Sequence, residues 1–234
     1  MILKIRIHIG SRQKCLRLPE NFAHKVLTEL SGLSALIPRF SPGGVVVFLP
    51  SYDYQNQLCS RWESTGLWDQ LSRSKRVFRE PRNSVDVPHR FTINQAVTSS
   101  NSVGALLICV IGGKLSEGIN FNDELARAVI VIGMPYPNPN SPLLREKMAY
   151  LDRQFGSRPH YEALCMRAIN QAIGRAVRHS KDYAAIFLVD RRFTRANIQQ
   201  KLPDWVLRGL ISATQAMQRL DAFFVATARR ETQN

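Results

Sequence analysis

The chain has 234 residues, 44% of them hydrophobic and 21% charged, which is typical of a globular protein, and no apolar run reaches the roughly 18 residues that a membrane-spanning helix needs. Its four cysteines are scattered without a C-x-x-C pair, which argues against a zinc or iron–sulfur site in this chain and for a reducing compartment. The formal net charge of +14 favours a polyanionic partner such as nucleic acid over a basic protein that merely stays in solution.

The N-terminal stretch M-I-L-K-I-R-I-H-I-G alternates apolar and basic residues. This alternation predicts a short strand, because a signal peptide would need a continuous apolar core. A helix is predicted over residues 23–37. Residues 1–41 together are interpreted as a divergent lead-in to the domain that follows.

Four short and continuously apolar segments are typical of parallel strands that are buried on both faces. They lie at 44–49, 105–110, 128–133 and 184–189. Helical patterns separate them at 53–63, at 141–151 with Ser141 as N-cap and Pro142 in the first turn, and at 161–178, and a further helix is predicted from Pro203 into the tail. Strands that alternate with helices predict an α/β fold with an open parallel sheet.

Polar residues follow each predicted strand at its carboxyl end. They are found at 50–52, 112–120, 134–137 and 190–192. Since ligands of open α/β sheets bind beyond the carboxyl ends of the strands, this edge of the sheet is predicted to be functional. The glycines of G-G-K-L-S-E-G-I-N-F (112–121) suit a loop whose backbone approaches a charged ligand, although an ordinary tight turn has a similar composition.

The helical segment 161–178 places four polar side chains on one narrow face. At 100° per residue, Arg167, Arg175 and Arg178 fall within roughly 40° of Gln171. The opposite side carries apolar residues, namely Ile169, Ala172, Ile173, Ala176 and Val177. A solvated basic face is the simplest interpretation. Two guanidinium groups one turn apart, beside an amide, also form a clamp for phosphate oxygens, and such arginines stabilise charge that develops on a γ-phosphate.

Several motifs in order resemble those of the XPD-like, iron–sulfur-containing DNA helicases of superfamily 2. The sequence Q-A-I-G-R-A-V-R (171–178) is similar to their motif VI, G-G-K-L-S-E-G-I-N-F to motif V, and V-V-V-F-L-P-S-Y (45–52) to the region of motif IV. Three further segments also match this group: M-P-Y-P-N-P-N-S-P (134–142), M-A-Y-L-D (148–152) and L-V-D-R-R-F (188–193). Together the motifs look most like the chromosome-loss, sister-chromatid-cohesion type of helicase.

The resemblance implies a second RecA-like motor domain over residues 42–210, followed by a helical tail at 211–234. In this family ATP and Mg²⁺ lie between two such domains, and the first domain supplies the P-loop and the metal-binding acids. The second domain supplies arginine fingers, which are arginines that reach the triphosphate of the opposed domain. By motif position, Arg175 and Arg178 would be the fingers, and Gln171 would sense the γ-phosphate or order the attacking water.

Further roles follow from motif position alone. The resemblance implies ATP contacts or coupling by Glu117, Gly118, Asn120 and Gly174. It also implies contacts to the DNA backbone by Ser51, Tyr52, Lys114 and Ser116. Asp190 and Arg192 would connect the domain to its neighbours, with a structural salt bridge as an equal alternative. Asn120 departs from the pattern, because many relatives carry aspartate there.

The sequence holds no G-x-x-x-x-G-K-[ST] motif and no D-E-A-H-type acid pair. We therefore expect half of a motor: the first motor domain would be a partner, the iron–sulfur cluster would belong to that missing half, and the isolated chain would hydrolyse ATP negligibly. The resemblance further implies single-stranded or forked DNA as a partner, replication or cohesion factors, and a nuclear location. Two alternatives stay open: a truncated, non-catalytic nucleic-acid-binding module, and part of an RNA helicase.

Overall fold

The computed structural model describes residues 3–6, 43–82, 104–118, 121, 123–138, 140–155, 157–175 and 182–231. Two of the predicted site residues, Asn120 and Arg178, lie outside these ranges. The predicted helix at 23–37 lies outside them as well.

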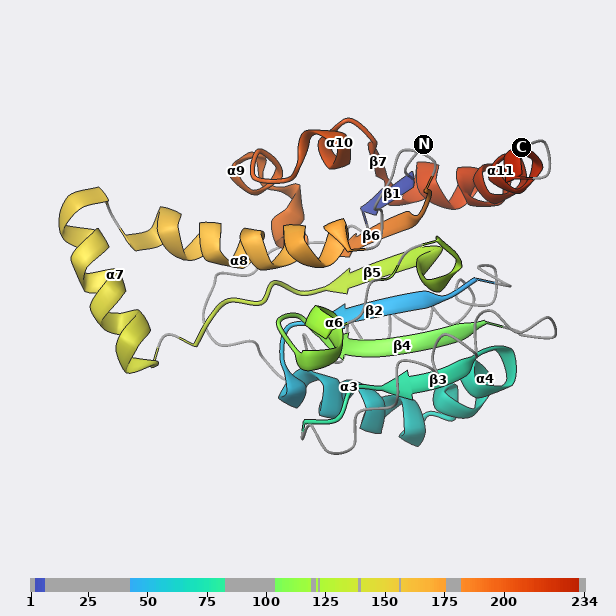
Figure 1. The fold of residues 1–234 in the computed structure, drawn as a ribbon, viewed down its shortest axis with the longest axis horizontal. Coiled ribbons are helices and arrows are strands. Elements are labelled where there is room, and N and C mark those ends of the chain that lie inside the picture. Colours follow the sequence, from blue (N-terminus) through green and yellow to red (C-terminus); the bar gives the residue numbers. More distant parts are fainter. Residues whose placement is uncertain are drawn as a thin grey trace.

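The described strands form one open sheet in which all neighbouring strands run parallel (Figure 1). Their order across the sheet is β3-β4-β2-β5-β6-β1-β7. In chain order the strands are β1 (Leu3–Arg6), β2 (Val45–Leu49), β3 (Arg76–Arg79), β4 (Ala105–Val110), β5 (Ala128–Ile132), β6 (Ala185–Val189) and β7 (Leu210–Ser212). The four buried strands predicted from sequence are confirmed to within one residue at each end. Because β1 pairs with β6 and β7, the predicted N-terminal strand is confirmed too.

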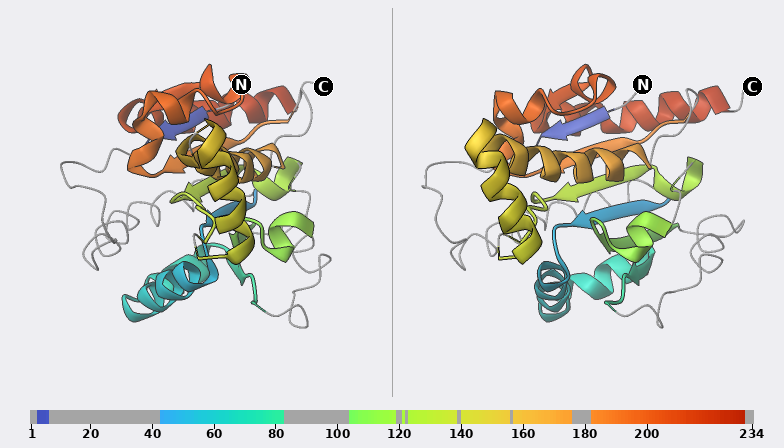
Figure 2. Two further views of the ribbon diagram at one scale, coloured as in Figure 1. Left: turned by 90° about the vertical axis from the view of Figure 1, so that its left-hand side faces the viewer. Right: turned by 60° about the vertical axis from the view of Figure 1, so that its left-hand side comes forward.

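Helices cover both faces of the sheet (Figure 2). They are α3 (Tyr52–Ser64), α4 (Leu67–Ser74), α6 (Lys114–Gly118), α7 (Pro142–Phe155), α8 (Ser157–Gly174), α9 (Ala196–Gln199), α10 (Asp204–Leu207) and α11 (Ala213–Glu231), with single 3₁₀ turns at Asp123–Ala126 and Arg191–Thr194. The predicted α/β class, an open parallel sheet between helical layers, is therefore confirmed. None of the described helices is long and apolar enough to cross a membrane.

Each central strand buries both of its faces, as its continuous apolar sequence predicts. On one face, Val45 and Val47 of β2 belong to a core with α3, α4 and α11, which contribute Trp62 and Phe223 among others. On the other face, Phe48 belongs to a core with α6 and α8, whose buried residues are Leu115, Cys165, Met166, Ile169, Ala172 and Ile173. Full burial of one large apolar side chain stabilises the folded state by about 1.5–3 kcal/mol. The two cores together therefore fix the strands whose carboxyl ends form the predicted functional edge.

Three features differ from the sequence prediction. The helix expected from Pro203 into the tail is wrong as a single element, because β7 separates α10 from α11. Leu210 and Ile211 pair with Lys4 and Ile5 of β1, and this pairing overrides the local helical pattern. The segment at 112–121, expected to be a loop, contains the short helix α6. Strand β3 was not predicted, since its sequence R-V-F-R is short and only half apolar. The proposed division at residues 41 and 210 stays a prediction.

Candidate functional site

The predicted functional edge lies at the carboxyl ends of the strands, to which the arrowheads in Figure 1 point. Ser51 and Tyr52 follow β2, and α6 follows β4 after one tight turn. The segment Met134–Pro137 follows β5, and Asp190 follows β6. Because all the strands run in parallel, these segments lie along one edge of the sheet.

The turn after β4 is built around a buried carboxylate that the sequence analysis missed. Glu80, just beyond β3, is 1% exposed. Its Oε2 accepts from the main-chain N–H of Val110 at 2.8 Å, and its Oε1 accepts from Leu115 N–H at 3.0 Å and from the Tyr52 hydroxyl at 3.1 Å. A Cβ atom at Gly113 would lie 2.3 Å from Glu80 Oε1, so a side chain there would displace the carboxylate. The glycine pair therefore serves a tight turn, in which Gly112 has φ +78° and Gly113 leaves room for Glu80.

The start of α3 carries two of the predicted DNA contacts. Ser51 caps the helix, since its hydroxyl accepts from Tyr54 N–H at 3.1 Å. Tyr52 is half-buried and directs its hydroxyl to Glu80. Burial and the charge of Glu80 raise the pKa of Tyr52 to about 12, so this hydroxyl is protonated at neutral pH and acts as a donor.

The two predicted DNA contacts in α6 differ in exposure. Lys114 is exposed at the first position of the helix, where it can meet a ligand. Ser116 is 4% exposed, and its hydroxyl donates to the carbonyl of Gly113 at 2.8 Å. Ser116 therefore stabilises the turn itself, and its contact with DNA stays a prediction.

Helix α8 has the polar and apolar faces that the helical wheel predicts. Ile169 and Ala172 are buried, whereas Gln171 and Arg167 are exposed. At its end, the half-buried Arg175 donates a hydrogen bond from its guanidinium group to the main-chain carbonyl of Glu117. The helix of motif VI is thus connected to the turn of motif V. A Cβ atom at Gly174 would meet no described atom within 4 Å, so this flank of the helix has room for a close approach.

Asp190 and Arg192 form the ion pair that the sequence left as an alternative. The guanidinium of Arg192 donates to both carboxylate oxygens of Asp190, at 2.8 and 2.7 Å. Its central carbon lies 5.0 Å from the ring centroid of Tyr136, and that ring stacks on Tyr161 of α8 at 5.1 Å. The hydroxyl of Tyr161 in turn donates to the carbonyl of Pro137. This stack fixes α8 against the loop after β5, and a role in coupling to another domain stays a prediction.

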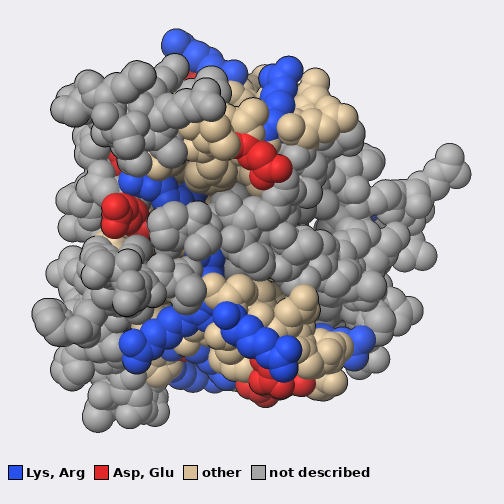
Figure 3. Space-filling view, turned by 90° about the vertical axis from the view of Figure 1, so that its right-hand side faces the viewer, with Lys and Arg blue, Asp and Glu red and all other residues tan. Residues whose placement is uncertain are grey.

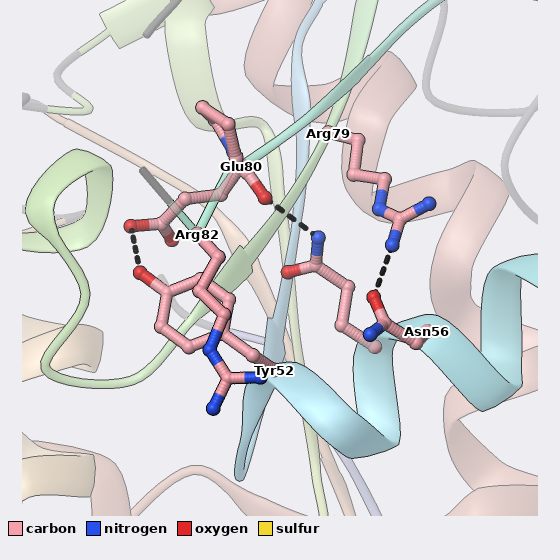
Figure 4. A pocket seen from close by; sticks show the side chains of 7 residues that line it. Tyr52, Asn56, Arg79, Glu80 and Arg82 are labelled. Atoms are coloured by element: carbon pink, nitrogen blue, oxygen red, sulfur yellow. Dashed lines mark hydrogen bonds between the residues drawn. The ribbon is translucent and has the colours of Figure 1, made fainter. Parts of the chain in front are cut away.

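A pocket of about 290 Å³ opens beside Tyr52 (Figure 4). The first turns of α3 and the chain after β3 line it, with Tyr52, Gln55, Asn56, Arg79, Glu80, Pro81 and Arg82. Arg79 donates to the side-chain oxygen of Asn56, and the exposed Arg82 lies 3.5 Å from Asp53. Gln55 Nε2 donates to the Glu80 carbonyl at 2.8 Å, so this bond connects α3 to the chain after β3 beside the pocket. Arg79 and Arg82 bring two guanidinium groups next to Tyr52, beside the carboxylates of Glu80 and Asp53.

Positive charge is not restricted to this edge. Figure 3 shows the molecule from the amino ends of the strands, and lysine and arginine side chains lie on that side as well. Net charge alone therefore indicates a polyanionic partner without locating its binding site.

Comparison with known proteins identifies the group to which this site belongs. A family model described as the helicase C-terminal domain matches residues 35–209. The chain belongs to this family. As a helicase C-terminal domain, it is 46% identical over 181 residues to the ATP-dependent DNA helicase DDX11 of Danio rerio, an alignment that covers 70% of this chain and 20% of the relative. It is 43% identical over 206 residues to the ATP-dependent DNA helicase chl-1 of Caenorhabditis elegans, with coverage of 86% and 24%.

Solved structures agree on the fold of this helicase domain. A structure described as an XPD helicase superposes with a TM-score of 0.61 at 20% identity, covering 90% of this chain and 35% of that one. The resemblance to XPD-like helicases of the chromosome-loss type is therefore confirmed. The chain spans about a quarter of the length of these curated relatives.

Sequence reasoning overlooked the residues that hold the site together. Glu80 and Arg79 lie in the basic stretch S-R-S-K-R-V-F-R-E-P-R (72–82), to which the sequence analysis assigned no site residue. The signal that could have revealed Glu80 is a lone acid at the end of a short β-type run, placed at the same sheet edge as the other polar residues.

Proposed function

We propose that this helicase domain is the C-terminal motor half of an ATP-dependent DNA helicase. In this proposal a first motor domain holds ATP and Mg²⁺, and the end of α8 presents Arg175 to the triphosphate. By motif position, Arg178 would be the second arginine finger. The observation that carries the proposal is the position of Arg175, at the end of an amphipathic helix and hydrogen-bonded to the motif V turn at the functional edge. A guanidinium held in this way can stabilise negative charge on the γ-phosphate as it develops.

The residues around Arg175 fit a nucleotide that is shared with another domain. Gln171 is exposed one turn earlier on the same face, where its amide can reach the γ-phosphate or a water molecule. Gly174 has no side chain to hold the opposed domain away, and a Cβ atom there would meet no described atom within 4 Å. Glu117 and Gly118 in α6, followed by Asn120, would contact the nucleotide or transmit its state to the strand. The iron–sulfur cluster of this family would lie in the first half and involves no residue of this chain.

We propose that the segments after β2 and β4 bind the DNA. Lys114 is exposed at the start of α6, and Ser51 with Tyr52 begins α3. Arg79 and Arg82 lie beside Tyr52, where their guanidinium groups can also contact a phosphate backbone. Contacts of this kind bind the phosphate backbone of single-stranded or forked DNA with little sequence preference, and they weaken as salt rises. From the resemblance to chromosome-loss-type helicases, we also expect the complete protein to act in the nucleus, alongside replication or cohesion factors.

A two-domain protein tests this proposal. The full 234-residue chain is joined behind the first motor domain of the Danio rerio relative, and ATP turnover is measured with and without single-stranded DNA; this fusion is called the two-domain motor below. We expect negligible turnover by the isolated chain and DNA-stimulated turnover by the two-domain motor. Turnover by the isolated chain that survives Arg175→Ala would contradict the proposal, as would a two-domain motor in which DNA stimulates nothing.

The two alternatives give different results in the same system. A non-catalytic nucleic-acid-binding module would bind DNA in the isolated chain but would support no turnover in the two-domain motor. Part of an RNA helicase would be stimulated more strongly by an RNA strand than by a DNA strand of matched sequence, because the 2′-hydroxyl distinguishes the two.

A further inference from the structure

The buried carboxylate of Glu80 connects two segments that lie far apart in the sequence. Tyr52 begins α3, and the turn at Gly113–Leu115 begins α6, and both are bound to this one side chain. Figure 4 shows the hydroxyl of Tyr52 directed at the carboxylate of Glu80, with which it forms a hydrogen bond. A buried carboxylate needs several donors to compensate for the loss of water, and here two main-chain N–H groups and one hydroxyl supply them. The relative position of α3 and α6 therefore depends on Glu80.

The same turn leads on to the proposed arginine finger. Leu115 donates its main-chain N–H to Glu80, and two residues later the carbonyl of Glu117 accepts from Arg175. Because α6 is a single short helix, a displacement at Leu115 moves the Glu117 carbonyl with it. Tyr52, Glu80, α6 and Arg175 thus form one continuous series of contacts from the proposed DNA-binding edge to the proposed ATP-binding residue.

We propose that Glu80 is a positioning residue that couples strand binding at Tyr52 and Lys114 to the placement of Arg175. The inference rests on the proposed function, because it takes Tyr52 and Lys114 as strand contacts and Arg175 as the finger. Glu80 itself touches neither the strand nor the nucleotide. Glu80 keeps Tyr52 and α6 at a fixed distance from each other. A DNA strand that contacts both Tyr52 and Lys114 therefore fixes the position of α6. Because α6 accepts the hydrogen bond from Arg175, the strand also fixes the orientation of the Arg175 guanidinium group.

Gly113 supplies independent support for this role. Its missing Cβ is what allows the carboxylate to lie 2.3–2.8 Å from the position that a Cβ would take. The packing of the Glu80 carboxylate therefore requires a residue without a Cβ atom at position 113. Gly113→Ala should displace the carboxylate and should reproduce, in part, the effect of changing Glu80 itself.

The test compares ATP turnover of the two-domain motor at saturating single-stranded DNA with turnover in its absence. Saturation removes any effect of affinity, so the ratio of the two rates reports coupling alone. The variants are Glu80→Gln, Tyr52→Phe and the double variant, with Glu63→Gln on the exposed side of α3 as the matched control. In Glu80→Gln the amide N–H₂ replaces one acceptor oxygen and faces the main-chain N–H of either Val110 or Leu115, so one bond that positions the side chain is lost. The remaining oxygen belongs to a neutral amide and accepts more weakly than a carboxylate, which loosens the connection between α3 and α6.

We expect Glu80→Gln to lower the ratio about 5- to 30-fold, a normal range for coupling between sites, while Glu63→Gln leaves it unchanged. Tyr52→Phe should lower the ratio less, and the double variant should be no worse than Glu80→Gln, because both changes break the same connection. A ratio for Glu80→Gln equal to that of Glu63→Gln would overturn the inference, and so would additive losses in the double variant.

Two further results keep the outcome clear. If Glu80→Gln does not fold, as judged by its circular dichroism, Tyr52→Phe is the deciding variant, because it keeps both main-chain hydrogen bonds of Glu80. A ratio unchanged by Tyr52→Phe would then reject the coupling.

Arg175→Ala separates this inference from the proposed function. If Arg175→Ala leaves DNA-stimulated turnover intact, the proposed function fails, whereas if it abolishes turnover and Glu80→Gln keeps the ratio, only the coupling fails.

Discussion

The guanidinium group of Arg175 donates a hydrogen bond to the main-chain carbonyl of Glu117, so the last turn of α8 is bound to the helix that follows β4. A carbonyl acceptor orients a guanidinium without neutralising its charge, because a carbonyl carries no formal charge of its own. This hydrogen bond therefore fixes the position of the Arg175 guanidinium group relative to α6.

The first prediction concerns this arginine. In the two-domain motor, Arg175→Ala should lower ATP turnover by roughly 10³–10⁵ without weakening the binding of single-stranded DNA. Arg175→Lys should recover little, because an ammonium group lacks the planar fork that contacts two oxygens at once. Arg167→Ala, at an exposed position of α8, is the control and should stay within a few-fold of the unmodified protein. Equal losses for Arg167→Ala and Arg175→Ala would remove the special role of Arg175.

Sequence reasoning predicted the strands and the buried face of α8 well, because both depend on the local pattern of apolar residues. Val45–Leu49 and Ala105–Val110 are buried along their whole length, as continuous apolar runs predict. It failed where distant segments decide the outcome. Leu210–Ser212 becomes a strand because β1 lies next to it, and no local pattern contains that information.

The same limit applies to the site. Motif order singled out Arg175, Gln171 and the glycine-rich turn as candidates, because these residues stand in recognisable sequence neighbourhoods, and their roles stay predictions. Glu80 could not be recognised from its sequence neighbours, because its role depends on Tyr52, Val110 and Leu115, which are 28 to 35 residues away along the chain. Ser116 looked like a ligand contact by its position in the motif, but its hydroxyl points back to Gly113.

The second prediction compares two glycines. Gly113→Ala should destabilise the chain by about 1–3 kcal/mol, because its Cβ would overlap the carboxylate of Glu80. Gly174→Ala meets no described atom within 4 Å and lies at the end of a helix, so it should be neutral or stabilising by up to about 1 kcal/mol. Urea denaturation of both variants measures the difference. A Gly113→Ala variant as stable as Gly174→Ala would show that the turn can move away from Glu80.

The third prediction concerns a buried ion pair near the amino end of β5. Arg127 lies 3.1 Å from Asp182, and the two side chains are 9% and 0% exposed. Arg127 also stacks on the ring of Tyr183 at 3.9 Å. Arg127→Met should cost about 3–5 kcal/mol of unfolding free energy, because it leaves the carboxylate of Asp182 buried without its cation.

An exposed pair in the same chain is the control for that change. Arg82 and Asp53 lie 3.5 Å apart with side chains that are 71% and 75% exposed. Arg82→Met should cost less than about 1 kcal/mol, because water already solvates both partners. Similar losses for the two variants in urea denaturation would mean that burial does not set the value of the Arg127 pair.

The fourth prediction uses pH to detect a buried lysine. Lys75 is 0% exposed and donates from Nζ to the carbonyl of Gly43 at 2.8 Å. Burial lowers the pKa of Lys75 from 10.5 to about 8. Between these two values the unfolded chain holds a proton that the folded chain lacks, so the contribution of Lys75 to the unfolding free energy rises with pH, by up to about 3 kcal/mol in total.

Buried thiols act in the opposite direction over part of the same range. Burial raises the pKa of Cys59 to about 11 and that of Cys165 to about 12, so their contribution to stability falls as pH rises above about 9. The measurement is therefore the difference in unfolding free energy between the unmodified chain and Lys75→Met, which retains both thiols. This difference should shift in favour of the unmodified chain as pH rises from 8 to 10.5. A difference that stays constant over that range would mean that Lys75 keeps its proton in the folded state.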